Sequence, residues 1–118
     1  MGVQYISAVT FAVRDMDRSV DFYERCGFHV VYGGRDAAFT SLQSGEAYVK
    51  LIGTAGYAST RWGRAIFRVA DADEQYRAMT AASLRPDAPP QDAAWGERYF
   101  HITDPDGHEL SFAQLITR

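Results

Sequence analysis

The sequence predicts an α+β fold built from two tandem βαβββ modules, and an internal repeat is the first observation that predicts it. Residues 11–17 and 67–73 share the pattern F-x-V-x-D-x-D, and the two copies begin 56 residues apart in a chain of 118. In each copy an alternating strand runs directly into a helix start. A repeat of this period indicates a duplicated supersecondary unit. Helix-capping residues and strand alternation in both halves are the second and third observations.

In the first half, alternation and capping residues define the elements. Residues 6–13 alternate with period two, which is typical of a half-buried strand. Asp15 is placed to cap a helix over 15–26, and Gly27 suits the left-handed position that ends one. Short strands rich in β-forming residues are expected at 28–32, 37–43 and 47–52. The single Cys26 lies on the apolar face of this helix, so we expect a buried structural thiol.

The second half repeats this order after a small, polar linker. We expect a strand at 62–69 and then a helix at 71–82, because Asp71 and Glu74 resemble a capping box. Three prolines between 86 and 90 restrict the next stretch to an edge or irregular strand. The last strands are expected at 97–103 and 109–115, around an Asp-Pro-Asp-Gly turn at 104–107. The predicted organisation is a single domain with module one at 1–53, the linker at 54–61 and module two at 62–118.

Composition excludes several classes of function. The net charge is −3 without a run of like charges, so a nucleic-acid partner is not expected. No segment approaches the roughly 18 consecutive apolar residues of a membrane span, and no signal peptide is visible. One cysteine fits a cytoplasmic protein. Aromatic residues are 14 % of the chain, and this surplus suits an aromatic-lined pocket.

An ordered set of residues in both halves carries a family resemblance that covers nearly the whole chain. The set comprises Val13, Asp15, Ser19, Phe22, Tyr23, Gly27 and Phe28, then Trp95, Gly96, Phe100, Asp104, Pro105, Asp106, Gly107 and Phe112. It resembles the vicinal oxygen chelate superfamily, which includes glyoxalase I, extradiol dioxygenases and bleomycin-resistance proteins. The resemblance implies that the sheets of the two modules curl around a cleft, with the helices outside. It also implies a homodimer, since clefts in this family are commonly completed by a second copy.

In the enzymes of that family, four side chains in the cleft bind a divalent metal, and the resemblance places these positions here. They fall at Ala8, Lys50, Arg64 and Ser111. Divalent cations need imidazole, carboxylate or thiolate ligands, which this set lacks. The sequence therefore predicts no metal and no cofactor. It argues against glyoxalase I and extradiol dioxygenase activity, which depend on the metal.

Strand parity predicts which side chains face the cleft. The candidate ligand-binding residues are Phe39, Tyr48, Lys50, Trp62, Arg64, Trp95, Tyr99, His101 and Ser111. Each also has a structural interpretation: Lys50 and Arg64 could be solvated or pair with Glu109, and the rings could fill the core. His101 and Glu109 are weak candidates for an acid or base. His108, in the turn, is expected to be exposed.

Three functions remain open at this stage. The first is metal-independent binding of a hydrophobic or aromatic small molecule, as in the bleomycin-resistance branch, which this chain resembles most in character. The second is a metal-independent lyase or isomerase with His101 or Glu109 as the base. The third is a partner-binding module whose cleft is filled by side chains.

Overall fold

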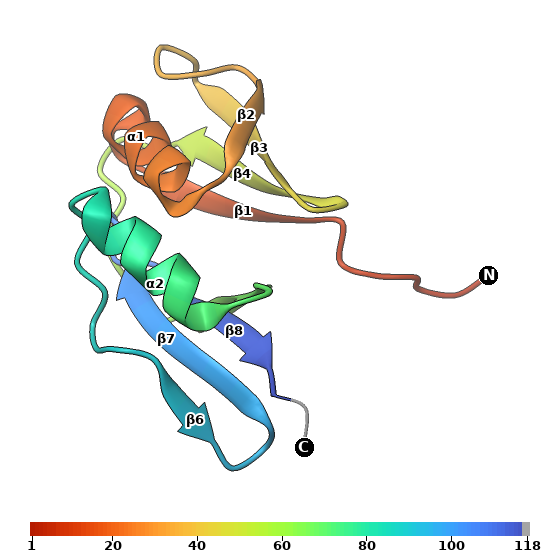
Figure 1. Ribbon diagram of the computed structural model, residues 1–118. Coiled ribbons are helices and arrows are strands. Elements are labelled where there is room, and N and C mark those ends of the chain that lie inside the picture. The colour runs from red at the N-terminus through yellow and green to blue at the C-terminus, as the bar shows by residue number, and fades with distance from the viewer. Residues whose placement is uncertain (117–118) are drawn as a thin grey trace. The chain divides into compact units, whose positions relative to one another are not determined.

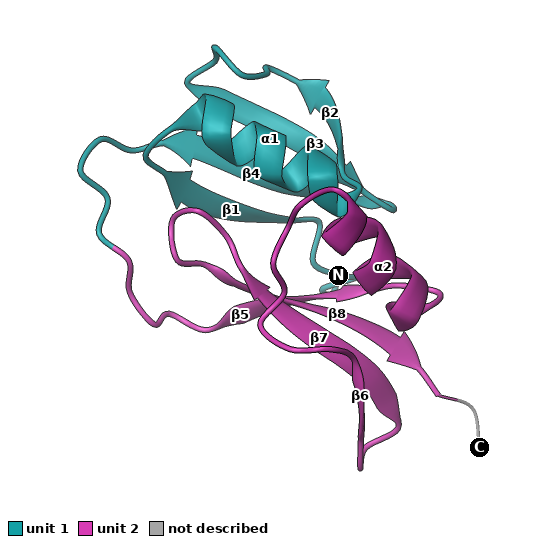
Figure 2. Cartoon of the chain, turned by 60° about the vertical axis from the view of Figure 1, so that its left-hand side comes forward, with its two compact units in different colours: residues 1–58 teal, residues 59–118 magenta. Residues whose placement is uncertain are grey.

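The computed structural model describes residues 1–116 and divides into two compact units, residues 1–58 and 59–118 (Figure 2). Each unit has the element order βαβββ (Figure 1). The first contains β1 (Ala8–Val13), α1 (Met16–Cys26), β2 (His29–Tyr32), β3 (Phe39–Ser44) and β4 (Ala47–Gly53). The second contains β5 (Arg64–Arg68), α2 (Ala72–Ala81), β6 (Gln91–Ala93), β7 (Glu97–Thr103) and β8 (Glu109–Leu115). The predicted α+β class with two βαβββ modules is confirmed, and the grouping into one domain stays a prediction.

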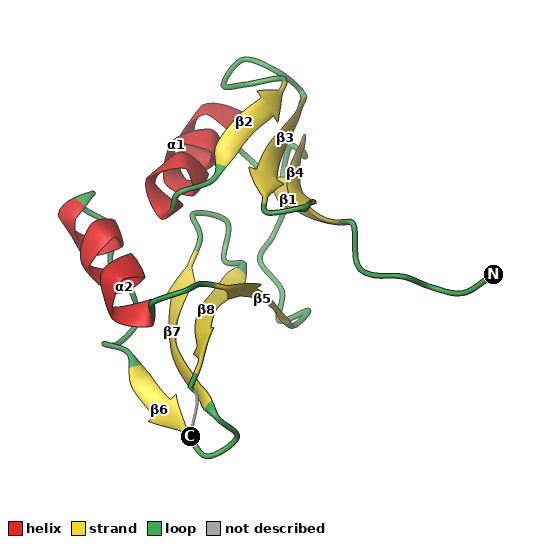
Figure 3. Ribbon diagram, turned by 45° about the vertical axis from the view of Figure 1, so that its right-hand side comes forward, coloured by secondary structure: helices red, strands yellow, loops and turns green. Residues whose placement is uncertain are grey.

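The two sheets have the same topology. Their strand orders are β1-β4-β3-β2 and β5-β8-β7-β6. In each, the first and last strands of the unit pair in parallel, and the other pairs are antiparallel. A helix crosses one face of each sheet, and Figure 3 shows both helices in red. The other face of each sheet carries the opposite parity of side chains, because successive residues of a strand point to opposite sides.

The helices begin and end where the sequence predicts. The Asp15 carboxylate accepts the backbone N–H of Arg18 at 3.2 Å, and Gly27 ends α1 with a φ of 108°. The Asp71 carboxylate accepts the N–H of Glu74 at 3.0 Å. These contacts satisfy amide groups that a helix end otherwise leaves without a partner.

Aromatic rings fill the core of the second unit on the helix side. The Phe100 and Phe112 rings stack at 5.5 Å, and Phe67 lies 5.6 Å from Phe112. Tyr76 of α2 meets Phe100 edge-on at 5.5 Å. The predicted parity of β7 is therefore confirmed for Phe100, which packs on the helix. The rings on the opposite face of the sheet remain available for another role.

Two sequence predictions need adjustment near β5 and β8. The strand expected at 62–69 begins two residues later, at Arg64, so Trp62 lies in the preceding loop. The prediction that His108 is exposed was wrong, because its side chain is 3 % exposed. The buried thiol of Cys26 is confirmed. Neither helix of the described chain has the length and apolar character that a membrane crossing requires.

Candidate ligand-binding site

The open face of the second sheet holds a pocket of about 270 Å³. Strand register builds it: Ile66 pairs with Ser111 on β8, and Ser111 pairs with His101 on β7, so these three side chains lie in one row. The pocket is lined by Arg64, Ile66, Trp95, Glu97, Tyr99, His101 and Ser111. The structure thus brings together five of the predicted site residues: Arg64, Trp95, Tyr99, His101 and Ser111.

Three rings follow one another along this face. The Trp95 and Tyr99 rings are nearly parallel, with centroids 6.0 Å apart and an interplanar angle of 24°. The His101 ring lies 5.0 Å from Tyr99, tilted by 46°. Trp95 is 70 % exposed, so one face of its indole is open to a ligand. Offset rings of this kind provide flat apolar area at low cost in conformational entropy.

Glu97 holds the indole of Trp95 in this arrangement. Its Oε1 accepts the Trp95 N–H at 2.8 Å, and its Oε2 accepts a hydrogen bond from Arg68 at 3.3 Å. The Tyr99 hydroxyl in turn accepts a hydrogen bond from the Gln91 amide at 2.8 Å. Sequence reasoning did not name Glu97 as a site residue. The signal was present, because Glu97 shares the parity of Tyr99 and His101 on one strand.

Arg64 connects the polar groups of the pocket. Its guanidinium forms an ion pair with Glu109, which is one of the alternatives that the sequence left open. It also lies 3.3 Å from Nε2 of His101. An arginine cannot accept a hydrogen bond, so Nε2 is assigned as the acceptor and the ring proton lies on Nδ1. His101 Nδ1 is buried and finds no partner among the described residues.

The environment of His101 favours its neutral form. Burial is the largest cause that lowers the pKa of His101 below its usual 6.5, and the positive charge of Arg64 is the next. Nearby carboxylates, Glu109 and Asp87, act in the opposite direction and are weaker. Desolvation and a neighbouring cation both disfavour the imidazolium ion. At neutral pH His101 is therefore a neutral ring in the aromatic row.

Three predicted site residues belong to the first unit and share the open face of its sheet. Register pairs Tyr48 with Gln43, Lys50 with Ser41, and Phe39 with Ile52. The Lys50 ammonium lies 5.9 Å from the centroid of the Phe39 ring, which is within the range of a cation–π contact. That these residues join the second sheet in one site stays a proposal.

Trp62 lies in the loop before β5 and not in the strand where the sequence analysis expected it. Its indole N–H donates to Nδ1 of His108 at 2.8 Å, and the ring is not part of the pocket lining described above. This contact joins the loop before β5 to the turn before β8. Trp62 is 47 % exposed, so part of its ring is still accessible.

The positions implied for a metal do not fit one. Ala8 and Lys50 are on the first sheet, and Arg64 and Ser111 are on the second. Arg64 is already paired with Glu109, and the Ser111 side chain is 3 % exposed. Within residues 1–116, no group of three or more His, Cys, Asp or Glu side chains could hold a metal ion. The donor set of these four residues therefore does not suit a divalent cation.

Comparison with known proteins places the chain in a family. Residues 5–112 match the model of the Glyoxalase/Bleomycin resistance protein/Dioxygenase superfamily, and the chain belongs to that superfamily. The resemblance inferred from the sequence is confirmed. A bleomycin resistance protein from Klebsiella pneumoniae is 29 % identical over 109 residues, which cover 86 % of this chain and 85 % of that protein.

Two solved structures are similar over almost the full length. A bleomycin-binding protein complexed with bleomycin is 28 % identical, with a TM-score of 0.75, over 95 % of this chain and 98 % of that one. A bleomycin resistance determinant encoded on the transposon Tn5 has the same identity and coverage, with a TM-score of 0.78.

Proposed function

We propose that this protein binds a small molecule with a flat aromatic part and sequesters it without changing it chemically. The observation that carries the proposal is the row of rings formed by Trp95, Tyr99 and His101 in a pocket with charged edges. Small-molecule sites are commonly concave, with apolar and aromatic walls and a few polar groups that fix orientation. The similar proteins whose names refer to bleomycin support an antibiotic as the class of ligand.

Each predicted site residue has a role in this proposal. Trp95 and Tyr99 stack on the ligand, and Arg64 and His101 anchor its polar groups. Tyr48, Lys50 and Phe39 of the first unit, together with Trp62, complete the site in the inter-module cleft that the family resemblance implies. Ser111 forms the floor of the pocket between Ile66 and His101. The same proposal includes a cytoplasmic location for the protein. It also holds that the ligand binds to this site without a metal ion.

A metal-independent enzyme is the second candidate, and the His101 geometry favours it. A neutral imidazole beside a guanidinium could move a proton while Arg64 stabilises the negative charge that develops. The two candidates differ in what happens to the ligand. Mass spectrometry of the bound molecule after long incubation therefore distinguishes them: an unchanged mass supports sequestration, and a changed mass supports the enzyme.

The binding test uses bleomycin first and then a set of aromatic natural products. Quenching of tryptophan fluorescence detects the binding. Trp62→Phe leaves Trp95 as the remaining tryptophan, so quenching then reports on the aromatic row. Covering one ring system contributes about 2–4 kcal/mol at about 25 cal/mol per Å², so Trp95→Ala is expected to weaken binding more than about tenfold. Isothermal titration calorimetry measures this loss, because substitution of Trp95 removes the fluorescent reporter. Trp95→Phe is the matched control, because it keeps a ring at the same position.

Two results would contradict the proposal. Equal affinity for the parent protein and Trp95→Ala would remove the aromatic row from the site. The absence of any binder in a broad library would favour the partner-binding module. Since Trp95 is largely exposed, neither substitution is expected to change the unfolding midpoint in urea appreciably.

A further inference from the structure

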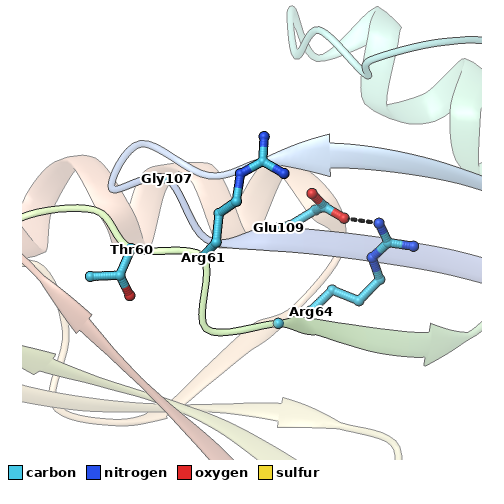
Figure 4. A pocket seen from close by; sticks show the side chains of 6 residues that line it. Thr60, Arg61, Arg64, Gly107 and Glu109 are labelled. Atoms are coloured by element: carbon cyan, nitrogen blue, oxygen red, sulfur yellow. Dashed lines mark ion pairs between the residues drawn. The ribbon is translucent and has the colours of Figure 1, made fainter.

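A second pocket, of about 260 Å³, lies where the loop before β5 meets the turn before β8. It is lined by Thr60, Arg61, Gly63, Arg64, Gly107 and Glu109 (Figure 4). Arg64 lines this pocket and the aromatic pocket, so the two adjoin at its side chain. Neither candidate function described for the aromatic pocket uses this second pocket.

Positively charged side chains outnumber negatively charged ones in the lining of this pocket. Figure 4 shows Arg61 and Arg64 on either side of Glu109, with an ion pair drawn only between Glu109 and Arg64. Arg61 forms no hydrogen bond or ion pair with any other residue in the described part of the chain. Two guanidinium groups therefore face one carboxylate. The carboxylates of the neighbouring turn, Asp104 and Asp106, are buried and do not line the pocket.

The loop that carries Arg61 is held at both ends. The Ser59 hydroxyl donates to the backbone carbonyl of Asp106, and Trp62 donates to His108 at 2.8 Å. Gly107 packs so closely on Ser59 that a Cβ at this position would meet the Ser59 hydroxyl. Arg61 thus projects from a loop that is anchored by a hydrogen bond on each side of it. A site ordered in advance loses less entropy when it binds.

We propose that this pocket binds an oxyanion, a carboxylate, sulfate or phosphate group, between Arg61 and Arg64 in place of the Glu109 carboxylate. The planar fork of a guanidinium matches the oxygens of such groups, and Glu109 already occupies that position on Arg64. Glu109 is therefore an internal competitor. Because Arg64 lines both pockets, the oxyanion can be a substituent of the aromatic ligand, and this part of the inference rests on the proposed function.

The first test uses inorganic sulfate alone, exchanged for chloride at constant ionic strength. Binding is followed by NMR through the backbone amides of Gly63 and Gly107, which line the pocket. We expect saturable shifts in the parent protein. Arg61→Ala should weaken binding about fivefold, and Glu109→Gln should strengthen it by a similar factor, since each change alters one charged contact at a partly exposed site. Arg85→Ala removes an exposed cation elsewhere in the same unit and should change nothing.

Non-saturating shifts that are the same in the parent protein and Arg61→Ala would overturn the inference. Weaker sulfate binding in Glu109→Gln would overturn it as well, because removal of a carboxylate that competes for Arg64 should strengthen anion binding. Thermal unfolding of each variant confirms that the comparison is made on folded protein. Arg61 and Glu109 are both accessible, so large losses of stability are not expected.

The second test separates a free anion from an anionic group on an aromatic ligand. It compares 1-naphthalenesulfonate with 1-naphthol, by fluorescence, in the parent protein and Arg61→Ala. We expect Arg61→Ala to weaken the sulfonate and leave the naphthol unchanged. Binding of both compounds without any effect of Arg61→Ala would overturn the inference and keep the aromatic site. Sulfate binding without binding of either naphthalene would support the oxyanion pocket and count against the proposed function.

Discussion

The indole N–H of Trp62 donates to Nδ1 of His108 at 2.8 Å, and the two rings meet edge-on with centroids 5.9 Å apart. The donation requires an unprotonated Nδ1, so the His108 ring accepts at this nitrogen. The contact spans 46 residues of sequence and ties the loop that carries Arg61 to the turn that precedes β8. It therefore supports the candidate oxyanion pocket from outside its lining.

The first prediction concerns the energy of this contact. Trp62→Phe keeps an aromatic ring and loses the donor, which should lower the free energy of unfolding by about 1 kcal/mol. His108→Ala also removes a buried ring and should cost about 1–3 kcal/mol. Because both variants lose the same hydrogen bond, the double variant should cost less than the sum by about 0.5–1.5 kcal/mol. Urea unfolding of the four proteins measures this cycle, and strict additivity would show that the hydrogen bond contributes nothing.

The sequence could predict the repeating architecture because its determinants are local. Alternation with period two, a capping aspartate and a terminal glycine each act over a few residues. They placed Tyr99 and His101 on one face of a strand and Phe100 on the other, as the structure has them. The same parity included Glu97, whose role depends on a side-chain contact to Trp95 across the turn between β6 and β7.

The orientation of His108 could not be predicted in this way. The side chain of Asp104 accepts the backbone N–H groups of Asp106 and His108, at 2.9 and 2.8 Å, which tightens the turn. His108 is then buried beside Trp62, which is distant in sequence. Alternation ends where the strand ends, so it carries no information on Trp62, two residues before β5. Long-range pairing of two loop residues leaves no periodic trace in a single sequence.

The second prediction is a homodimer. β1 and β5 each lie at an edge of their own sheet, and an edge strand has backbone groups that are open to pairing. Most soluble homo-oligomers close with two-fold symmetry, and the family resemblance implies the same. Light scattering should give twice the mass of one chain at tens of micromolar. The mass of a single chain at that concentration would contradict this prediction.

The third prediction is that the purified protein carries no stoichiometric transition metal. Two of the four positions that the family resemblance implies for a metal hold cationic side chains, Lys50 and Arg64, and the others hold Ala8 and Ser111. Such a set offers no strong ligand. Elemental analysis should therefore find far less than one Ni, Zn, Mn or Fe per chain. The informative control is Arg64→His with Ser111→Glu, which introduces two ligands and should raise metal content if the backbone geometry of the family is retained. About one metal per parent chain, lost on substitution at these positions, would refute the prediction.

The fourth prediction concerns the pH dependence of stability through His101. Burial first, and the charge of Arg64 second, lower the pKa of His101 in the folded protein below the value near 6.5 of an unfolded chain. As the pH falls, His101 therefore takes up its proton in the unfolded chain before it does so in the folded protein. This difference lowers the free energy of unfolding progressively from about pH 6.5 down to the pKa of His101 in the folded protein, and below that pKa the loss is complete. Above the pKa of His101 in the unfolded chain, this loss of stability is absent.

His101→Gln removes this titration. Between about pH 7.5 and about pH 5, the free energy of unfolding should therefore fall more in the parent protein than in this variant. Arg64→Ala should raise the pKa of His101 only in part, because burial remains the larger cause. Ring titration by NMR gives the pKa of His101 in the parent protein and in Arg64→Ala directly. A His101 pKa at or above about 6.5 in the parent protein would contradict this prediction.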